Sequence, residues 1–275
     1  MIEGNILRTV ISLRNMIAEM NRKNIELKRI TKTSSILLMS GLSANSIPEH
    51  IVKRCLDEQH EDGGWAGIGD TIWNAFFLKQ LGYSNFKDNI KRALNFMGNH
   101  RNKEGLWGRS NRDISRIPVS GLYFYLLPEA AESTELRLLE ELWYEEFGGI
   151  TYKAAYTLMA FKKKDYMPVN PQLIDDTVKW LVENQEADGG FSPWKAHPVD
   201  SDVFCTAIAT IGLLQYRERV DTKVFKRSYE WLHRNQLKNG IWKYHEIEDG
   251  TSWGLYAMVH LIDYFKTIKW RVSNG

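Results

Sequence analysis

A short glycine-containing phrase returns five times along the chain. It reads EDGGWAG at 61–67, KEGLWGR at 103–109, EFGGITY at 146–152, ADGGFSP at 187–193 and KNGIWKY at 238–244. With Gly64, Leu106, Gly149, Gly190 and Gly240 taken as equivalent, the steps are 42, 43, 41 and 50 residues. A period of this length is typical of repeat architectures, in which each unit is one supersecondary structure that must stack on its neighbours.

The segments on either side of each phrase differ in polarity. Amphipathic stretches such as LIDDTVKWLVENQ (173–185) precede it, with apolar residues at helical spacings of three, four and seven. Almost wholly apolar stretches such as VFCTAIATIGLL (203–214) follow it. An amphipathic helix belongs at a surface and an apolar one in a core. Each repeat is therefore expected to be an outer helix, a glycine turn and an inner helix.

Five hairpins of this kind are clear, and the first fifty residues supply a sixth, with an inner helix in TSSILLMSGL (33–42). Polar capping repeats are not evident at either end, which favours a closed double ring over an open solenoid. We expect residues 1–275 to form one all-α domain, an α/α toroid of five to six helical hairpins. Residues 1–32 carry seven Lys or Arg against three acids. They are expected to form a basic helix packed on or beside the ring, with peripheral contact with a membrane surface as the alternative.

The composition excludes several classes of protein. Lys plus Arg number 36 against 34 Asp plus Glu, without the basic excess of nucleic-acid-binding domains. Two cysteines exclude a disulfide scaffold. No apolar run approaches the roughly 18 residues of a membrane span, and the start lacks a secretory cleavage signal. We expect a soluble cytoplasmic protein, with peripheral membrane attachment left open.

The turn residues have a structural interpretation. Glycine tolerates positive φ, and a Trp or Phe directly after it can lie over the end of the hairpin. Gln59, Gln185 and Gln236 precede the glycines and can bond free main-chain groups at helix ends. Most of the tryptophans are therefore expected to hold the fold together.

The phrases DEQHEDGGW, ENQEADGGF and RNQLKNGIW, each followed by an apolar inner helix, resemble the prenyltransferase and squalene-oxidase repeat. That repeat builds the α/α toroids of class II terpene cyclases and of protein prenyltransferase β subunits, and the resemblance spans about residues 50–265. It implies a terpene cyclase-like enzyme of isoprenoid biosynthesis, of isomerase or lyase type, that cyclises an isoprenoid or other long apolar substrate through carbocations. Class II cyclases place the reactive cavity between two helical domains, so a partner domain or subunit is also implied.

Class II cyclases resemble one another in a DxDD run before Thr-Ala, whose central Asp protonates an alkene or epoxide. This sequence has PVDSDVFCTA at 198–207. Anchoring on Thr-Ala puts Phe204 and Cys205 where the two decisive acids stand, whereas anchoring on the acids pairs Asp200 and Asp202 with DxD. The resemblance implies Asp200 and Asp202 as the catalytic acid or its support.

A second interpretation of these acids is structural. An Asp just before an apolar helix is a standard N-cap. Aligning GDTIWNA with SDVFCTA places Asp70 where Asp202 stands, so both are also candidate caps. Asp113 and Asp249 occupy equivalent loop positions and are alternative acids.

A carbocation needs a water-free cavity lined by aromatic faces, which stabilise positive charge. The aromatic residues on the expected inner helices that supply such a lining are Trp73, Tyr123, Tyr125, Tyr156, Phe204, Trp253 and Tyr256.

Charged loop residues extend this hypothesis. Arg109, Arg112 and Arg116 can clamp a diphosphate beside helix N-termini, in which case Mg²⁺ accompanies it, and solvated loop charges are the alternative. Without a diphosphate no cofactor is expected. His197 and His245 lie in post-glycine loops and can orient an acid.

Two further functions remain open. Protein prenyltransferases hold Zn²⁺ with Asp, Cys and His, and the resemblance places Asp202 at the Cys position and Thr251 and Ser252 where the His is expected, so we expect no metal site. A prenyltransferase-like enzyme using a prenyl diphosphate as leaving group is one alternative. A non-catalytic toroid that binds a lipid, a peptide or a partner protein is the other.

Overall fold

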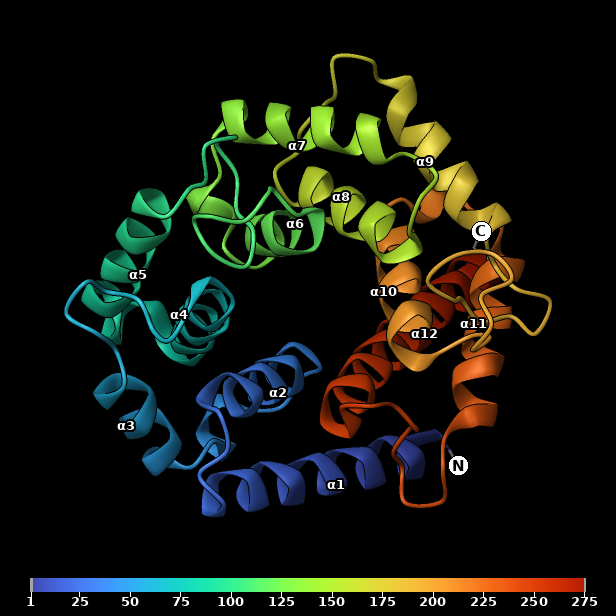
Figure 1. Ribbon diagram of the computed structural model, residues 1–275. Coiled ribbons are helices and arrows are strands. Elements are labelled where there is room, and N and C mark those ends of the chain that lie inside the picture. Colours follow the sequence, from blue (N-terminus) through green and yellow to red (C-terminus); the bar gives the residue numbers. More distant parts are fainter. Residues whose placement is uncertain (1, 275) are drawn as a thin grey trace.

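Two concentric rings of helices form the protein, as the computed structural model in Figure 1 shows. The structure describes residues 2–274, and the side chains of residues 4–268. The outer helices are α1 (Ile2–Arg22), α3 (Glu49–Asp57), α5 (Lys87–Asn99), α7 (Ser133–Glu146), α9 (Gln172–Glu183) and α11 (Thr222–Asn235). The inner helices are α2 (Leu27–Met39), α4 (Ile68–Gly82), α6 (Ile117–Leu126), α8 (Thr151–Lys163), α10 (Val203–Leu214) and α12 (Ile247–Asn274). The predicted α/α toroid is confirmed, with six hairpins in the described residues.

The inner helices pack side by side in chain order, and α12 returns to pack against α2, which closes the ring. Helix α1 contacts both α2 and α12, so it covers the junction between the last and first inner helices. The basic segment 1–32 is thus divided between a full outer helix and the start of an inner one. Four short 3₁₀ helices, η1 to η4, lie between an inner helix and the next outer helix.

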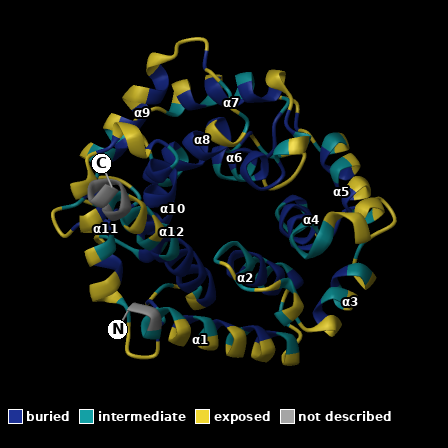
Figure 2. Cartoon of the chain, turned by 180° about the vertical axis from the view of Figure 1, so that it is seen from behind, coloured by how far each residue is buried: buried dark blue, intermediate teal, exposed yellow. Residues whose placement is uncertain are grey.

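Burial follows the polarity of the sequence. Figure 2 shows the inner helices largely buried and the outer helices exposed along their outward faces. The inner helix α10, for example, buries eleven of its twelve residues, from Val203 to Leu214, with Phe204 partly exposed. The hydrophobic core is therefore the layer between the rings together with the inward side chains of the inner ring.

The glycine turns share one backbone conformation. Gly63, Gly105, Gly148 and Gly189 have φ of 93°, 84°, 80° and 93°, and Gly240 has 86°. The alignment of Gly240 with Gly64 and Gly190 is therefore wrong by one residue, because Gly240 matches the first glycine of each pair. The last repeat step becomes 51 residues, from 189 to 240.

An aromatic residue follows four of the five turns, and Ile150 follows the third. Three of these aromatic residues, all tryptophans, bond both helices of their hairpin. The indole N–H of Trp65, Trp107 and Trp242 donates in each case to the main-chain carbonyl ten residues earlier, at 2.8 to 2.9 Å. The main-chain N–H of the same residues, and of Phe191, donates to a hydroxyl of the following inner helix. The expectation that these aromatic residues hold the fold together is confirmed.

These hydroxyls also correct the alignment of the inner helices. Thr71 accepts from Trp65 N–H and Thr206 accepts from Phe191 N–H, so these two threonines are equivalent. Asp70 then matches Cys205 and not Asp202. The repeat alignment by GDTIWNA and SDVFCTA was thus shifted by three residues, close to one helical turn.

Each turn also packs on the next outer helix. Gln59 Nε2 donates to Gly63 O at 2.8 Å within its own turn and to Asn89 O at 3.0 Å on α5. Gln185 makes the same pair of bonds to Gly189 O and to Val224 O on α11. The glutamines therefore bond the turn itself and the neighbouring outer helix.

The last turn uses helix α1 in the same way. Gln236 Nε2 donates to Gly240 O at 3.1 Å and to Thr9 Oγ1 at 2.8 Å, and Thr9 Oγ1 donates to Gly240 O at 2.8 Å. A Cβ on Gly240 would lie 2.6 Å from Thr9 N. Helix α1 thus stands to the last turn as α5 stands to the first.

Ion pairs add to this closure. Three cations of α2 face acids on the two flanking inner helices. Lys28 Nζ lies 3.6 Å from Asp70 Oδ2 on α4, and Arg29 Nε donates to Glu248 Oε1 at 2.6 Å on α12. Lys32 Nζ lies 2.7 Å from Asp249 Oδ1, also on α12. Part of the positive charge of segment 1–32 is therefore matched by acids inside the ring.

No helix of the described residues is long and apolar enough to cross a membrane.

Candidate functional site

The inner helices begin at one common end of the ring, which we call the mouth. The ion pair between Lys28 and Asp70 joins the first turns of α2 and α4, and the bond between Arg29 and Glu248 joins those of α2 and α12. Thr151 N, at the start of α8, donates to Pro193 O in the segment before α10 at 2.8 Å. The mouth therefore gathers the six helix N-termini and the loops that carry most of the candidate site residues.

Two tyrosines meet across the ring. Tyr125 lies near the end of α6 and Tyr256 lies on α12, and their hydroxyls are 2.8 Å apart. In the order of the inner ring α6 and α12 are three positions apart, so they stand opposite one another (Figure 1). The ribbon leaves an apparent hole at the centre, but this hydrogen bond spans it. Burial raises the pKa of the Tyr256 hydroxyl above its ordinary value and that of the Tyr125 hydroxyl well above it. Both hydroxyls therefore stay protonated at neutral pH.

Two tryptophans extend this group toward the mouth. Trp253 contacts Tyr256 edge to face at 5.9 Å between ring centroids, and Trp73 contacts Trp253 in the same way at 6.2 Å. Both indoles are buried. Trp73, Trp253, Tyr256 and Tyr125 therefore form one continuous aromatic chain, from α4 through α12 to α6.

One ion pair, formed by Lys32 and Asp249, lies against this chain of aromatic rings. Lys32 Nζ stands 5.6 Å from the centroid of the Trp73 ring, within cation–π range, and 2.7 Å from Asp249 Oδ1. Asp249 is only 9% exposed. Burial, followed by the nearby Asp249 carboxylate, raises the pKa of Tyr156, which lies on α8 across the ring from α2. The sequence analysis missed Lys32 because it assigned residues 1–32 to a basic segment and began the first inner helix at residue 33, whereas α2 begins at Leu27.

Asp202 caps helix α10. Its Oδ1 accepts the main-chain N–H of Cys205 at 2.8 Å, at the N-terminus of α10, as the capping interpretation predicts. Asp200 is exposed, with φ of 59°, in the loop before this cap. No hydrogen bond joins Asp200 to Asp202 among the described residues. Asp202 is therefore engaged as a cap, and Asp200 is open to solvent.

Asp70 and Asp113 are engaged elsewhere. Asp70 lies inside the first turn of α4, where Gly67 is the N-cap residue and no side chain caps the helix, so the capping prediction for Asp70 is wrong. Asp113 forms two hydrogen bonds with Arg116, at 2.7 and 3.0 Å. These bonds, with one from Arg109 N–H, hold the pKa of the Asp113 carboxyl below its usual range.

The arginine cluster is consequently divided. The Arg116 guanidinium forms a salt bridge with Asp113, while the side chains of Arg109 and Arg112 are exposed on the loop before α6.

The remaining aromatic candidates lie in two places. Phe204 stacks on Tyr244 at 5.9 Å with an interplanar angle of 18°, and its other edge meets Tyr152 at 6.0 Å. All three are partly buried and lie near the mouth. Tyr123 instead packs on Trp107, at 4.8 Å, and so belongs to the layer between the rings. Tyr152 and Tyr244 were missed because each is the last residue of a repeat phrase, whose residues were interpreted as turn residues.

A groove opens at the mouth between the segment 193–203 and the segment 231–245. Its volume is about 840 Å³. His197, His245 and Asp202 line it, together with Arg234, Lys243 and Tyr244, which sequence reasoning did not single out. Both histidines were predicted to orient an acid, and the structure places them in the same groove as Asp202.

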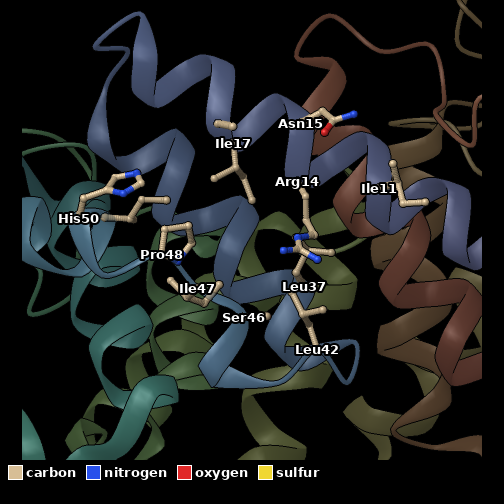
Figure 3. A pocket seen from close by; sticks show the side chains of 12 residues that line it. Ile11, Arg14, Asn15, Ile17, Leu37, Leu42, Ser46, Ile47, Pro48 and His50 are labelled. Carbon is tan, nitrogen blue, oxygen red and sulfur yellow. The ribbon is translucent and has the colours of Figure 1, made fainter.

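A second cavity lies away from the mouth, between the outer helix α1, the end of the inner helix α2 and the start of α3. Figure 3 shows it between α1 and the segment that follows α2, with Ile11 and Ile17 on one side and Leu37, Ile47 and Pro48 on the other. Its volume is about 340 Å³, and its lining is mainly apolar. None of the predicted site residues lines it.

The residues that the resemblance aligns with the zinc ligands of protein prenyltransferases form hydrogen bonds within the fold. Asp202 caps α10, Thr251 Oγ1 accepts Trp242 N–H at 3.3 Å, and Ser252 Oγ donates to Asp249 O at 3.0 Å. These residues do not fit a thiolate–imidazole zinc site.

Comparison with known proteins supports the fold. The type II terpene cyclase MstE from Scytonema superposes with a TM-score of 0.68 at 15% identity, covering 97% of this chain and 99% of that one. The ent-copalyl diphosphate synthase from Streptomyces platensis gives a TM-score of 0.59 at 16% identity, covering 86% of this chain and 49% of the synthase. Structures of MstE contain geranylgeranyl dihydroxybenzoate as substrate and merosterolic acid A as product. At these identities the likeness is one of fold.

One similarity is visible in sequence. Lanosterol synthase from Pneumocystis carinii is 33% identical over 117 residues, which cover 38% of this chain and 16% of that enzyme. The chain therefore spans only about a sixth of the length of the curated relative it matches. No protein-family model matches the sequence.

Proposed function

We propose that this protein is a terpene cyclase-like enzyme that folds an isoprenoid chain against the aromatic side chains inside the ring and cyclises it through carbocations. The observation that carries the proposal is the aromatic chain of Trp73, Trp253, Tyr256 and Tyr125, with an ammonium group already seated over Trp73. Aromatic faces stabilise a cation without forming a bond to it, which is the requirement for a migrating carbocation.

The fold likeness supports the same class of substrate. MstE, whose structure is matched over 99% of its chain, binds a geranylgeranyl compound as substrate. A single ring of this size can therefore hold an isoprenoid in that protein, without the second domain that the sequence resemblance implies. In this chain Tyr125 and Tyr256 must separate, or the substrate must stop above them.

The interior charges define what Asp249 can do. The Lys32 ammonium lies 2.7 Å from Asp249 Oδ1 and forms an ion pair with it beside Trp73. In this proposal the Asp249 carboxylate stabilises a cation formed beside Trp73 and Trp253. Initiation by Asp200 and Asp202 remains part of the proposal, although the cap on α10 and the exposure of Asp200 argue against it.

That placement favours a second function. If neither Asp200 nor Asp202 protonates a substrate, the ring is a binding protein for an isoprenoid or another lipid. The two functions share the aromatic interior and differ only in turnover.

A product survey by mass spectrometry separates them. The purified protein is incubated with C15 and C20 prenyl diphosphates and with squalene, with and without Mg²⁺. The Asp200→Asn/Asp202→Asn variant is the matched control, since Asn also caps helices and keeps α10 intact. A cyclic product lost in this variant supports the acid pair.

A cyclic product retained in the variant supports a cyclase whose proton comes from another group. Tight binding of the prenyl compounds without any product supports the binding function. Neither binding nor product would refute both.

A further inference from the structure

The mouth groove combines cationic and imidazole groups with apolar walls. Arg234 and Lys243 bring two positive charges, and His197 and His245 add two imidazoles. Asp202 is the carboxylate among the lining residues, and its Oδ1 already accepts the N–H of Cys205. The charge balance of the lining is therefore positive.

Neither Arg234 nor Lys243 forms a salt bridge with a residue that lines the groove. Arg234 donates to the main-chain carbonyl of Asp188 at 3.0 Å, a bond that holds the guanidinium near the Asp188 carboxylate without a salt bridge between the two side chains. The Asp188 carboxylate accepts three hydrogen bonds from other groups, which are Gly190 N–H, Ser201 Oγ and Trp231 Nε1. Lys243 is exposed on the loop before α12.

The walls of the groove suit an apolar chain. Val199 is 74% exposed and Leu237 is 39% exposed, on the two segments that flank the groove. Trp231, Trp242 and Tyr244 form much of the remaining lining. A volume of about 840 Å³ falls in the range of small-molecule sites, roughly 300–1,000 Å³.

Aromatic contacts lead from the groove to the first turns of the inner helices α10 and α8. Tyr244 lines the groove and stacks on Phe204, which in turn meets Tyr152 on α8. A chain that enters along Tyr244 therefore meets an uninterrupted aromatic surface at the mouth.

We propose that this groove binds the oxyanion head of an isoprenoid substrate through Arg234 and Lys243, with the apolar chain running over Tyr244 and Phe204 into the ring. The inference rests on the proposed function and deepens it by naming the substrate class: an isoprenoid that carries a phosphate-type or carboxylate head. It replaces the arginine cluster of the loop before α6 as the head-binding site.

Binding is measured by calorimetry on the full chain with three probes that share one C20 chain. Geranylgeranyl diphosphate and geranylgeranoic acid have anionic heads, and geranylgeraniol has a neutral one. We expect at least one anionic probe to bind at least tenfold more tightly than the alcohol, since charge-assisted hydrogen bonds are stronger than neutral ones. The preference between diphosphate and carboxylate identifies the head.

Three double variants locate the site, and the third of them, Arg109→Gln/Arg112→Gln, tests the loop before α6. Arg234→Gln/Lys243→Gln is expected to weaken binding of the preferred anionic probe by about tenfold or more and to leave geranylgeraniol within twofold. Lys223→Gln/Lys226→Gln removes the same charge from exposed positions on the same helix α11 and is expected to have no effect. Circular dichroism of all variants checks that the ring is folded.

The outcomes distinguish the inference from the function on which it rests. Equal binding of the anionic probe by wild type and Arg234→Gln/Lys243→Gln overturns the groove as head site, and a selective loss in Arg109→Gln/Arg112→Gln overturns it in favour of that loop. Binding of geranylgeraniol in either case keeps the proposed function. Failure of all three C20 probes, with inorganic pyrophosphate binding only to wild type, supports the anion site and refutes the isoprenoid function.

Discussion

Replacing Gly240 with alanine tests how the ring is closed. Gly240 has φ of 86°, and an added Cβ would lie 2.6 Å from Thr9 N and 2.9 Å from Arg8 C on α1. Gly41 provides a matched control, because its φ is 96° and an added Cβ meets nothing within 4 Å. The two substitutions share the conformational cost and differ in the contact with α1.

The free energy of unfolding separates the two contributions. Alanine at a positive φ costs about 1 kcal/mol or somewhat more, which is the whole effect expected for Gly41→Ala. Gly240→Ala adds a main-chain clash that pushes α1 outward, and overpacking of this kind costs roughly 1–3 kcal/mol. The outward shift also strains the bonds among Thr9, Gln236 and Gly240. We expect a total of about 3 kcal/mol.

Urea unfolding followed by tryptophan fluorescence measures both variants against wild type. Gly63→Ala serves as a positive reference, because its Cβ would lie 2.4 Å from Arg92 O on α5 in the equivalent turn. Equal destabilisation by Gly41→Ala and Gly240→Ala would show that α1 does not close the ring by this contact, and the reasoning would fail.

Four further results are expected. Tyr125→Phe leaves the buried Tyr256 hydroxyl without its partner and should lower the free energy of unfolding by about 1–2 kcal/mol, measured by denaturant titration, whereas no change would mean the hydroxyls do not meet. Asp202→Ala should cost about 1 kcal/mol and Asp202→Asn much less, because Asn retains the cap on α10, and a thermal melt that ranks them otherwise contradicts the cap. Both cysteines are buried, which raises the pKa of each thiol, so a thiol reagent should modify them only after unfolding. The Asp113 carboxyl should titrate below about pH 4 by NMR, and its pKa should rise in Arg116→Gln. Because this pKa is lowered in the folded chain, the stability that Asp113 contributes is present above about pH 4 and is lost on acidification.

Periodicity was sufficient for the fold. The 42-residue repeat and the alternation of amphipathic and apolar segments predict hairpins, and hairpins with one apolar helix must stack with that helix inward. The details that failed were registers. Gly240 and Asp70 were aligned by local letters, whereas the structure aligns repeats by φ at the first glycine and by the hydroxyl that accepts the next aromatic N–H.

The site was harder to predict because it is built from several repeats. Asp200 and Asp202 are close in sequence, yet one is exposed and the other caps a helix. Lys32 and Asp249 are 217 positions apart and meet because α2 and α12 adjoin when the ring closes. Their pairing depends on closure, which no local pattern encodes.

The junction between α1 and the last turn has a consequence for the order of folding. Gln59 joins its turn to α5 across 30 residues of chain, whereas Thr9 joins α1 to Gly240 across 231. The loop entropy of the longer connection exceeds that of the shorter one by about 2 kcal/mol, from the logarithmic dependence on length. Forming this contact from the unfolded chain therefore costs more entropy at the junction between α1 and the last turn than at the first turn. Hairpins should dock along the chain first and the circle should close last, so the amides of α1 should exchange with solvent before those of α5 or α11.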